Sequence, residues 1–107
     1  MARALITAPA SAKRGEVIEI RALLQHPMET GFRPGDDGKI QARDIVTSFT
    51  CTYDGAPVFA AELFAAVAAN PYLSFHTVAT ATGTLKFDWI GDNGFTHSET
   101  HALTVTG

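Results

Sequence analysis

Apolar and polar side chains alternate along much of the chain, which is the pattern of β-strands that bury one face. The run at residues 84–90 is the clearest, because Leu85, Phe87 and Trp89 alternate with polar neighbours. Alternation or a high content of β-branched residues marks further segments at residues 16–24, 44–53, 74–80 and 96–106. The pattern predicts a chain made mainly of strands.

Short turn signals separate these segments, because residues that tolerate positive φ angles fall between them. They lie at residues 13–15, 36–38, 54–55, 82–83 and 91–94. Asp54 and Gly55 predict a two-residue hairpin from Tyr53 to Ala56. About seven strands at this spacing in 107 residues predict an all-β fold. We expect an immunoglobulin-like antiparallel β-sandwich that forms a single domain over residues 1–107.

Residues 60–69, AAELFAAVAA, depart from the strand pattern and have the composition of a helix. Asn70 and Pro71 would end such a helix. Because a helix of about ten residues is marginal on its own, we expect a strand to about Glu62. A short helical or irregular crossover between the sheets then follows.

Charge and cysteine content exclude several classes of protein. The net charge is −3 and the eight Lys and Arg residues are scattered, so no nucleic-acid surface is predicted. No apolar run reaches the ~18 residues of a membrane span. The start, MARALIT, is too short and strand-like for a signal peptide, which by itself predicts a cytoplasmic protein. The only cysteine, Cys51, excludes an intrachain disulfide and a thiolate metal cluster.

No catalytic motif is found in the sequence. None of the four serines lies in a G-x-S-x-G elbow, and no phosphate-binding glycine motif occurs. The carboxylates Asp36, Asp37, Asp92 and Glu99 fall in turns or outward positions, where solvation is the ordinary explanation. We predict no catalytic residue, no cofactor and no enzymatic activity.

The candidate metal ligands are four histidines, since imidazole binds copper and zinc. They are His26, His76, His97 and His101. His97 and His101 would face the same side of a strand about 13 Å apart, too far to share one metal. His26 and Met28 form a softer pair that could attract copper. We predict no metal site and expect surface histidines, with copper binding by His26 and Met28 kept as the alternative.

Cys51 alternates with Phe49 and Tyr53 on the apolar face of a predicted strand. This position predicts a buried, inert thiol. No cationic residue flanks Cys51 to favour a reactive thiolate. An intermolecular disulfide or a redox role is the remaining alternative.

Residues 26–33, HPMETGFR, combine several kinds of side chain between two candidate strands. Pro27 removes an amide donor and restricts His26 to an extended backbone, so a strand ends here or runs along an edge. Thr30 and Gly31 then turn the chain.

Two interpretations of this stretch remain open. It is either an edge loop with an exposed Glu29–Arg33 ion pair, or a recognition loop whose exposed Met28 and Phe32 bind another protein. The candidate partner-recognition loop consists of His26, Pro27, Met28, Glu29, Thr30, Gly31, Phe32 and Arg33.

Several stretches of the chain are similar to the SoxZ family of the bacterial thiosulfate-oxidising system. They are GEVIEIR at 15–21, QHPMETGFR at 25–33, FTCTY at 49–53, ANPY at 69–72, TVAT at 77–80 and GDNG at 91–94. The resemblance runs from about residue 3 to 105.

This resemblance implies an immunoglobulin-like sandwich that pairs with SoxY in the SoxYZ sulfur-carrier complex. There the substrate is bound covalently, through sulfur, to a cysteine on a flexible Gly-Gly-Cys-Gly-Gly arm of SoxY. Because this chain ends in TVTG, we expect it to be the non-catalytic companion. It would support SoxY and contact the Sox oxidising enzymes transiently through the complex.

The resemblance also changes the expected location. It implies a periplasmic protein without a signal peptide of its own, exported together with SoxY, and this replaces the cytoplasmic expectation. We also expect that the isolated chain can form a homodimer. The rival hypothesis is a small periplasmic copper-binding β-sandwich protein that uses His26 and Met28.

Overall fold

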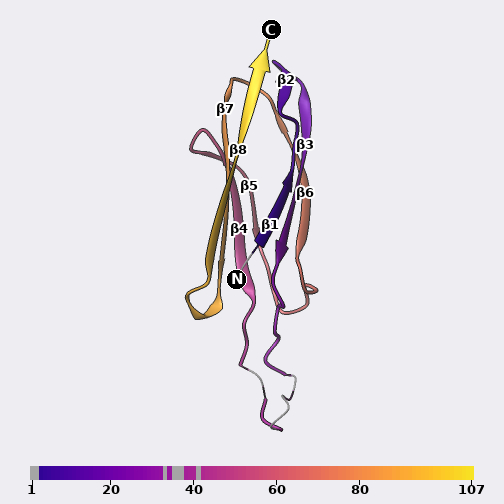
Figure 1. Ribbon diagram of the computed structural model, residues 1–107, viewed down its shortest axis with the longest axis vertical. Helices are drawn as coiled ribbons and strands as arrows, with labels where there is room; N and C mark the ends of the chain where they lie inside the picture. The colour runs from indigo at the N-terminus through magenta and orange to yellow at the C-terminus, as the bar shows by residue number, and fades with distance from the viewer. Residues whose placement is uncertain (1–2, 33, 35–37, 41) are drawn as a thin grey trace.

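A computed structural model describes residues 3–32, 34, 38–40 and 42–107 (Figure 1). The elements in chain order are β1 (Arg3–Thr7), β2 (Ser11–Lys13), β3 (Val17–Gln25), β4 (Val46–Tyr53), β5 (Ala56–Glu62), β6 (Tyr72–Val78), β7 (Gly83–Gly91), the 3-10 helix η1 (Asp92–Gly94) and β8 (Thr96–Thr106). Within this part of the chain, no helix has the length and apolar character needed to cross a membrane.

The strands form two sheets that face one another across a core (Figure 1). One sheet has three strands in the order β1-β3-β6, and the other has five in the order β2-β8-β7-β4-β5. The predicted all-β, immunoglobulin-like sandwich is confirmed, with eight strands in the described residues rather than about seven. The pairing is antiparallel except between β2 and β8, which are parallel. The short β2 and its parallel pairing were not predicted.

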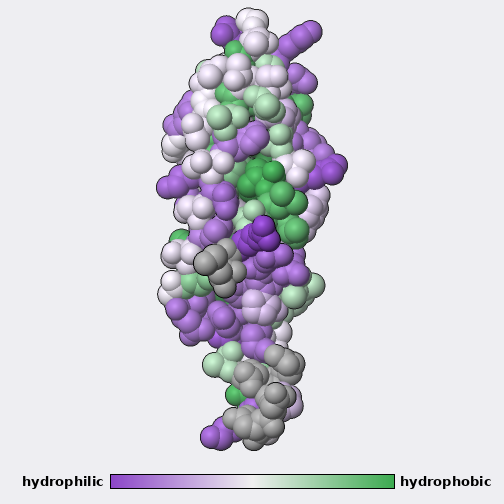
Figure 2. Space-filling view, in the orientation of Figure 1, coloured by the Kyte–Doolittle hydropathy of each residue, from purple (hydrophilic) through white to green (hydrophobic). Residues whose placement is uncertain are grey.

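The core is aromatic and lies between the two sheets. Phe49 is fully buried on β4, and the rings of Phe59, Phe75, Phe87 and Trp89 lie 5.1 to 6.3 Å from it. Because these rings come from both sheets, Phe49 packs against side chains of both layers. The predicted inward side chains of β7 are confirmed. On the side seen in Figure 2, most of the surface is polar, with a hydrophobic patch over β1.

The predicted hairpin between β4 and β5 is confirmed. Asp54 and Gly55 have φ angles of +49° and +84°. A two-residue hairpin turn of type I′ requires positive φ angles at both of these positions. Asp54 Oδ1 also accepts a hydrogen bond of 2.9 Å from the Thr84 amide. The register shifts between Cys51 and Thr52, which leaves a bulge in the edge strand β5.

The crossover from β5 to β6 contains no helix. Strand β5 ends at Glu62, as predicted, and the chain continues in turns and bends to residue 71. Leu63 is buried and its amide donates to Thr47 O at 2.9 Å. The crossover was predicted to be either helical or irregular, and the structure shows that it is irregular.

Candidate partner-binding loop

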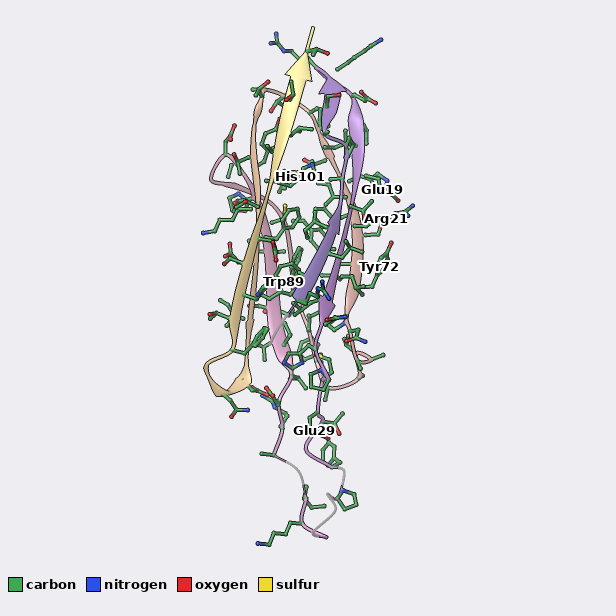
Figure 3. The ribbon with its side chains drawn as sticks, viewed as in Figure 1. Glu19, Arg21, Glu29, Tyr72, Trp89 and His101 are labelled. Carbon is green, nitrogen blue, oxygen red and sulfur yellow. The ribbon has the colours of Figure 1, made fainter. Side chains whose placement is uncertain are left out.

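Between β3 and β4, the described residues 26–32, 34, 38–40 and 42–45 begin and end against the sandwich and otherwise form a protrusion beyond it (Figure 1). We call this segment the β3–β4 protrusion, and it contains the predicted recognition loop. Isolated antiparallel bridges join Glu29 to Asp44 and Pro34 to Ile40. Backbone hydrogen bonds of 2.9 and 2.8 Å run in both directions between Glu29 and Asp44. Glu29 lies on the protrusion, beyond the ends of the sheets (Figure 3).

His26 lies buried at the base of the protrusion, with 5% of its surface exposed. Its amide donates to Asn70 Oδ1 at 3.0 Å, and its carbonyl accepts from the Asn70 amide at 2.7 Å. Its ring meets Phe95 edge-on, with the centroids 4.9 Å apart. The expectation of a surface histidine is wrong for His26, because two segments distant in sequence close over it.

The imidazole of His26 also shapes the backbone that follows it. Its Nδ1 accepts a hydrogen bond of 3.0 Å from the Met28 amide, so the neutral ring carries its proton on Nε2. Nε2 lies 3.7 Å from Asp44 Oδ1. Thus His26 acts as a local acceptor that stabilises a turn of the main chain.

Met28 turns inward, where the sequence predicted an exposed side chain. Its φ angle is +52°, which is uncommon for a residue other than glycine. The side chain is 4% exposed, and its Sδ accepts from the Val46 amide at 3.3 Å. The prediction of exposure was wrong because the left-handed backbone, stabilised by His26, directs the side chain into the core.

This geometry does not favour the copper alternative. Both His26 Nδ1 and Met28 Sδ already accept backbone hydrogen bonds, which a metal at those atoms would displace. Among the described residues, no group of three or more His, Cys, Asp or Glu side chains is placed to hold a metal ion.

A carboxylate after β7 fastens the protrusion to the sandwich. Asp92 accepts from Arg43 Nε at 2.8 Å, from Arg43 Nη2 at 2.9 Å and from the Ile45 amide at 3.2 Å. The hydrogen bond from Arg43, and then that from Ile45, hold the pKa of Asp92 below its ordinary value. Asn93 Nδ2 adds a hydrogen bond of 3.2 Å to Arg43 O. The prediction that Asp92 is merely solvated is wrong.

Farther out, the protrusion carries exposed apolar side chains. Phe32 is 81% exposed, as predicted, and Ile40 is 61% exposed. Gly31 has a φ angle of +88°, and a Cβ atom there would lie 3.1 Å from Arg43 Cβ. Glu29 is half-buried. The predicted Glu29–Arg33 ion pair involves Arg33, which lies outside the described residues.

The remaining histidines have separate neighbours. His76 is exposed, with Nε2 3.9 Å from Glu19 Oε2. His97 Nε2 lies 2.9 Å from Glu99 Oε1, and His101 Nε2 lies 2.8 Å from Pro9 O. His97 and His101 are half-buried rather than on the surface. Two other predicted surface carboxylates, Asp36 and Asp37, lie outside the described residues.

Cys51 is fully buried within the core. Desolvation, with a smaller effect from Asp88, raises the pKa of its thiol to about 11. This position matches the predicted inert thiol. It is incompatible with an intermolecular disulfide unless the core opens.

The residues that build the base of the protrusion were missed by the sequence analysis. They are Asn70, Phe95, Arg43 and Asp92, all distant from His26 in sequence. Asn70 and Asp92 lie within the ANPY and GDNG stretches of the family resemblance, which could have indicated them, whereas Phe95 and Arg43 lie outside all the quoted stretches.

In the described residues, a β-sandwich carries a protrusion whose base is held by hydrogen bonds and an ion pair. Comparison of the sequence with known families identifies the family of the chain. A family model described as "Sulphur oxidation protein SoxZ" matches residues 6–102. The chain belongs to the SoxZ family. A comparison with curated proteins finds no match.

Solved structures share the SoxZ-family fold at low identity. The sulfur carrier protein SoxY from Chlorobium limicola f thiosulfatophilum superposes with a TM-score of 0.69 and 14% identity, over 97% of this chain and 79% of that one. A superoxide reductase (neelaredoxin) from Ignicoccus hospitalis gives a TM-score of 0.74 and 14% identity, over 96% of this chain and 80% of that one. At these identities the likeness establishes the fold alone.

Proposed function

We propose that this chain is the non-catalytic subunit of a SoxYZ-type sulfur-carrier complex, where it binds and supports a SoxY-like partner. The match to the SoxZ family over residues 6–102 carries the proposal. In such a complex, as the family resemblance implies, the C-terminal cysteine arm of SoxY holds the sulfur substrate covalently. This chain then supplies a protein surface instead of a reacting group.

The state of Cys51 supports that division of roles. A sulfur carrier needs an accessible thiolate, whereas Cys51 is fully buried and the pKa of its thiol is raised to about 11. The reacting thiol of the complex must then belong to the partner.

The β3–β4 protrusion supports a role in partner recognition. Its base is fixed by His26, Met28 and the Arg43–Asp92 ion pair, so its position relative to the sandwich is set before binding. Phe32 and Ile40 remain exposed on it. We propose that His26 and Met28 shape the loop and that Phe32 contacts the partner or a Sox oxidising enzyme.

The proposal includes a periplasmic location without a signal peptide of its own, through export together with SoxY. Expression with and without a SoxY-like chain, followed by cell fractionation, tests it. We expect periplasmic protein only when both chains are present. Equal periplasmic amounts of this chain without SoxY would contradict co-export.

Native mass spectrometry of the mixed chains tests the complex itself. We expect a stoichiometric complex with a SoxY-like partner, and two separate species at micromolar concentration would overturn the proposal. The contribution of the loop is measured with Phe32→Asp, which places a charge where an apolar contact is expected and should weaken binding at least about tenfold.

A matched control for that variant is Thr100→Asp. Thr100 is exposed on β8 and lies opposite Lys86, which accommodates the new carboxylate. We expect the control to bind like the unmodified chain. Equal affinity of the Phe32 variant and the control would remove Phe32 from the interface.

A further inference from the structure

The three-stranded sheet exposes apolar side chains on its outer face. Eight large hydrophobic residues of the described chain are exposed, and half of them lie on this face. These four are Leu5 on β1, Val17 on β3, and Tyr72 and Val78 on β6. Exposed large apolar side chains that gather on one face of a sheet mark a candidate interaction surface.

Strand register joins some of these side chains into a continuous row. Leu5 pairs with Leu23, and Leu23 pairs with Tyr72, so the row crosses all three strands. Leu5 is 62% exposed and Tyr72 is 55% exposed, while Leu23 between them is half-buried. Figure 2 views the sandwich from its β1 edge, where hydrophobic side chains gather over β1, the strand that carries Leu5.

The opposite sheet provides an internal comparison. The outward side chains of β8 are mostly hydroxyls and are exposed, as expected of a sheet face that water covers. The hydroxyl side chains are Thr96, Ser98, Thr100, Thr104 and Thr106, and the remaining outward residue is Ala102. The apolar row is therefore a property of one sheet and not of the whole surface.

A hollow and a polar border accompany the row. A cavity of about 300 Å³ opens on the sheet beside it, lined by Arg3, Ala4, Leu5, Leu23 and Gln25. On its other side, Glu19 binds Arg21 at 2.9 Å and accepts from Ser74 at 3.3 Å. Glu19, Arg21 and Tyr72 point away from the sandwich on the same side (Figure 3). An apolar centre with a hollow and a polar rim is the arrangement of a protein interface.

We infer that the SoxY-like partner covers the outer face of the β1-β3-β6 sheet, centred on the row Leu5–Leu23–Tyr72, with a side chain inserted in the adjoining hollow. This inference rests on the proposed function and names the surface that it uses. SoxY has the same sandwich fold, with a TM-score of 0.69. Two sandwiches of one fold can pack sheet against sheet.

Charge favours SoxY over a second copy of this chain as the occupant. The face carries two arginines, Arg3 and Arg21, against one glutamate, Glu19. A second copy would bring the same positive excess to the contact. A different chain is free to present neutral or acidic groups there.

The face alone is smaller than a standard protein interface, so the partner is expected to contact the protrusion as well. Strands of five, nine and seven residues average about 23 Å in length, so the face measures about 14 by 23 Å, or roughly 300 Å² in projection. A standard interface covers about 800 Å² on each partner. Because β3 leads directly from the row at Leu23 to the protrusion at His26, the partner can reach both surfaces at once.

The test measures the dissociation constant for purified SoxY-like partner with Leu5→Asp and Tyr72→Asp, and with Thr100→Asp as the matched control on the other sheet. Circular dichroism checks the fold of each variant. We expect both sheet variants to bind at least about tenfold more weakly, and the control to bind like the unmodified chain.

Unchanged affinity of both folded sheet variants would overturn the inference and leave the proposed function standing. If the unmodified chain forms no complex, both fail. A homodimer of the unmodified chain that Leu5→Asp dissociates, without a change in partner affinity, would assign the face to a second copy and also overturn the inference.

Hydroxyl-radical footprinting of the unmodified chain gives an answer that does not depend on variant folding. We expect complex formation to lower oxidation of Tyr72 and Leu5 at least about fivefold, because burial excludes the radical, while Ile90 on the other sheet keeps its oxidation rate. Equal oxidation of Tyr72 and Leu5 in the free and bound chain would overturn the inference.

Discussion

Arg43 and Asp92 form a two-point ion pair between side chains 49 residues apart, with N–O distances of 2.8 and 2.9 Å. The first residue lies on the returning side of the β3–β4 protrusion and the second in the turn after β7. Since Asp92 also accepts from the Ile45 amide, this carboxylate orients the protrusion just before the chain enters β4.

Asp92→Asn should loosen the base of the protrusion. The amide side chain keeps the shape of the carboxylate but loses its charge and one acceptor oxygen. Hydrogen exchange should become faster at the Ile45 amide and remain slow at core amides of β7. The control is Asp88→Asn, which makes the same charge change on a residue that binds Ser98 and Lys86 instead. Unchanged exchange at Ile45 would contradict the orienting role.

Acid should release the same contact. The folded-state pKa of Asp92 lies below its ordinary value, chiefly through Arg43. A carboxylate with a lowered pKa stabilises the fold above its unfolded value of about 3.9, and this contribution is lost as the pH falls through the lower folded value. An NMR titration of the Ile45 amide shift should therefore have its midpoint below pH ~3.9. A midpoint at or above that value would refute the assignment.

Met28→Leu separates the sulfur hydrogen bond from side-chain volume. Leucine has a similar size and the same difficulty with a positive φ angle, but it leaves the Val46 amide without its acceptor. An unsatisfied buried donor costs about 1 to 3 kcal/mol, so the free energy of unfolding in urea should fall by that amount. Phe32→Leu, at an exposed position of the same protrusion, should stay within about 0.5 kcal/mol. Equal stability of the two variants would show that the sulfur contact contributes nothing.

Cys51 should resist thiol reagents in the folded protein. A thiol pKa near 11 instead of 9.0 makes the thiolate about a hundredfold scarcer, and burial blocks access as well. We expect little labelling by a disulfide reagent at pH 8, and full labelling after unfolding in urea. Native labelling at the rate of a free thiol would contradict the buried position.

Local patterns predicted the elements whose structure depends on neighbouring residues. Leu85, Phe87 and Trp89 are buried as their alternation predicted, because the inner face of β7 packs against the opposite sheet. Asp54 and Gly55 form the expected turn because tight hairpins require positive φ angles. In both cases the physical cause lies within a few residues of the chain.

The base of the protrusion could not be predicted in this way. His26 and Met28 were expected at the surface, but Asn70, Phe95 and Val46 approach them from distant segments. Alternation carries no information about such contacts, because burial there depends on how the sheets meet. The resemblance to the SoxZ family indicated the importance of residues 26–33, but not which side chains point inward.

The free edge of β5 has a consequence for how the chain remains dispersed. Strand β5 pairs with β4 on one side only, and its outer edge, apolar from Ala56 to Ala61, could recruit strands from other molecules and grow into fibrils. Pro57 lacks an amide hydrogen to donate, and the bulge near it breaks the regular spacing of the backbone. These two features discourage endless edge-to-edge growth, so newly made chains can stay in solution long enough to encounter a partner on another surface.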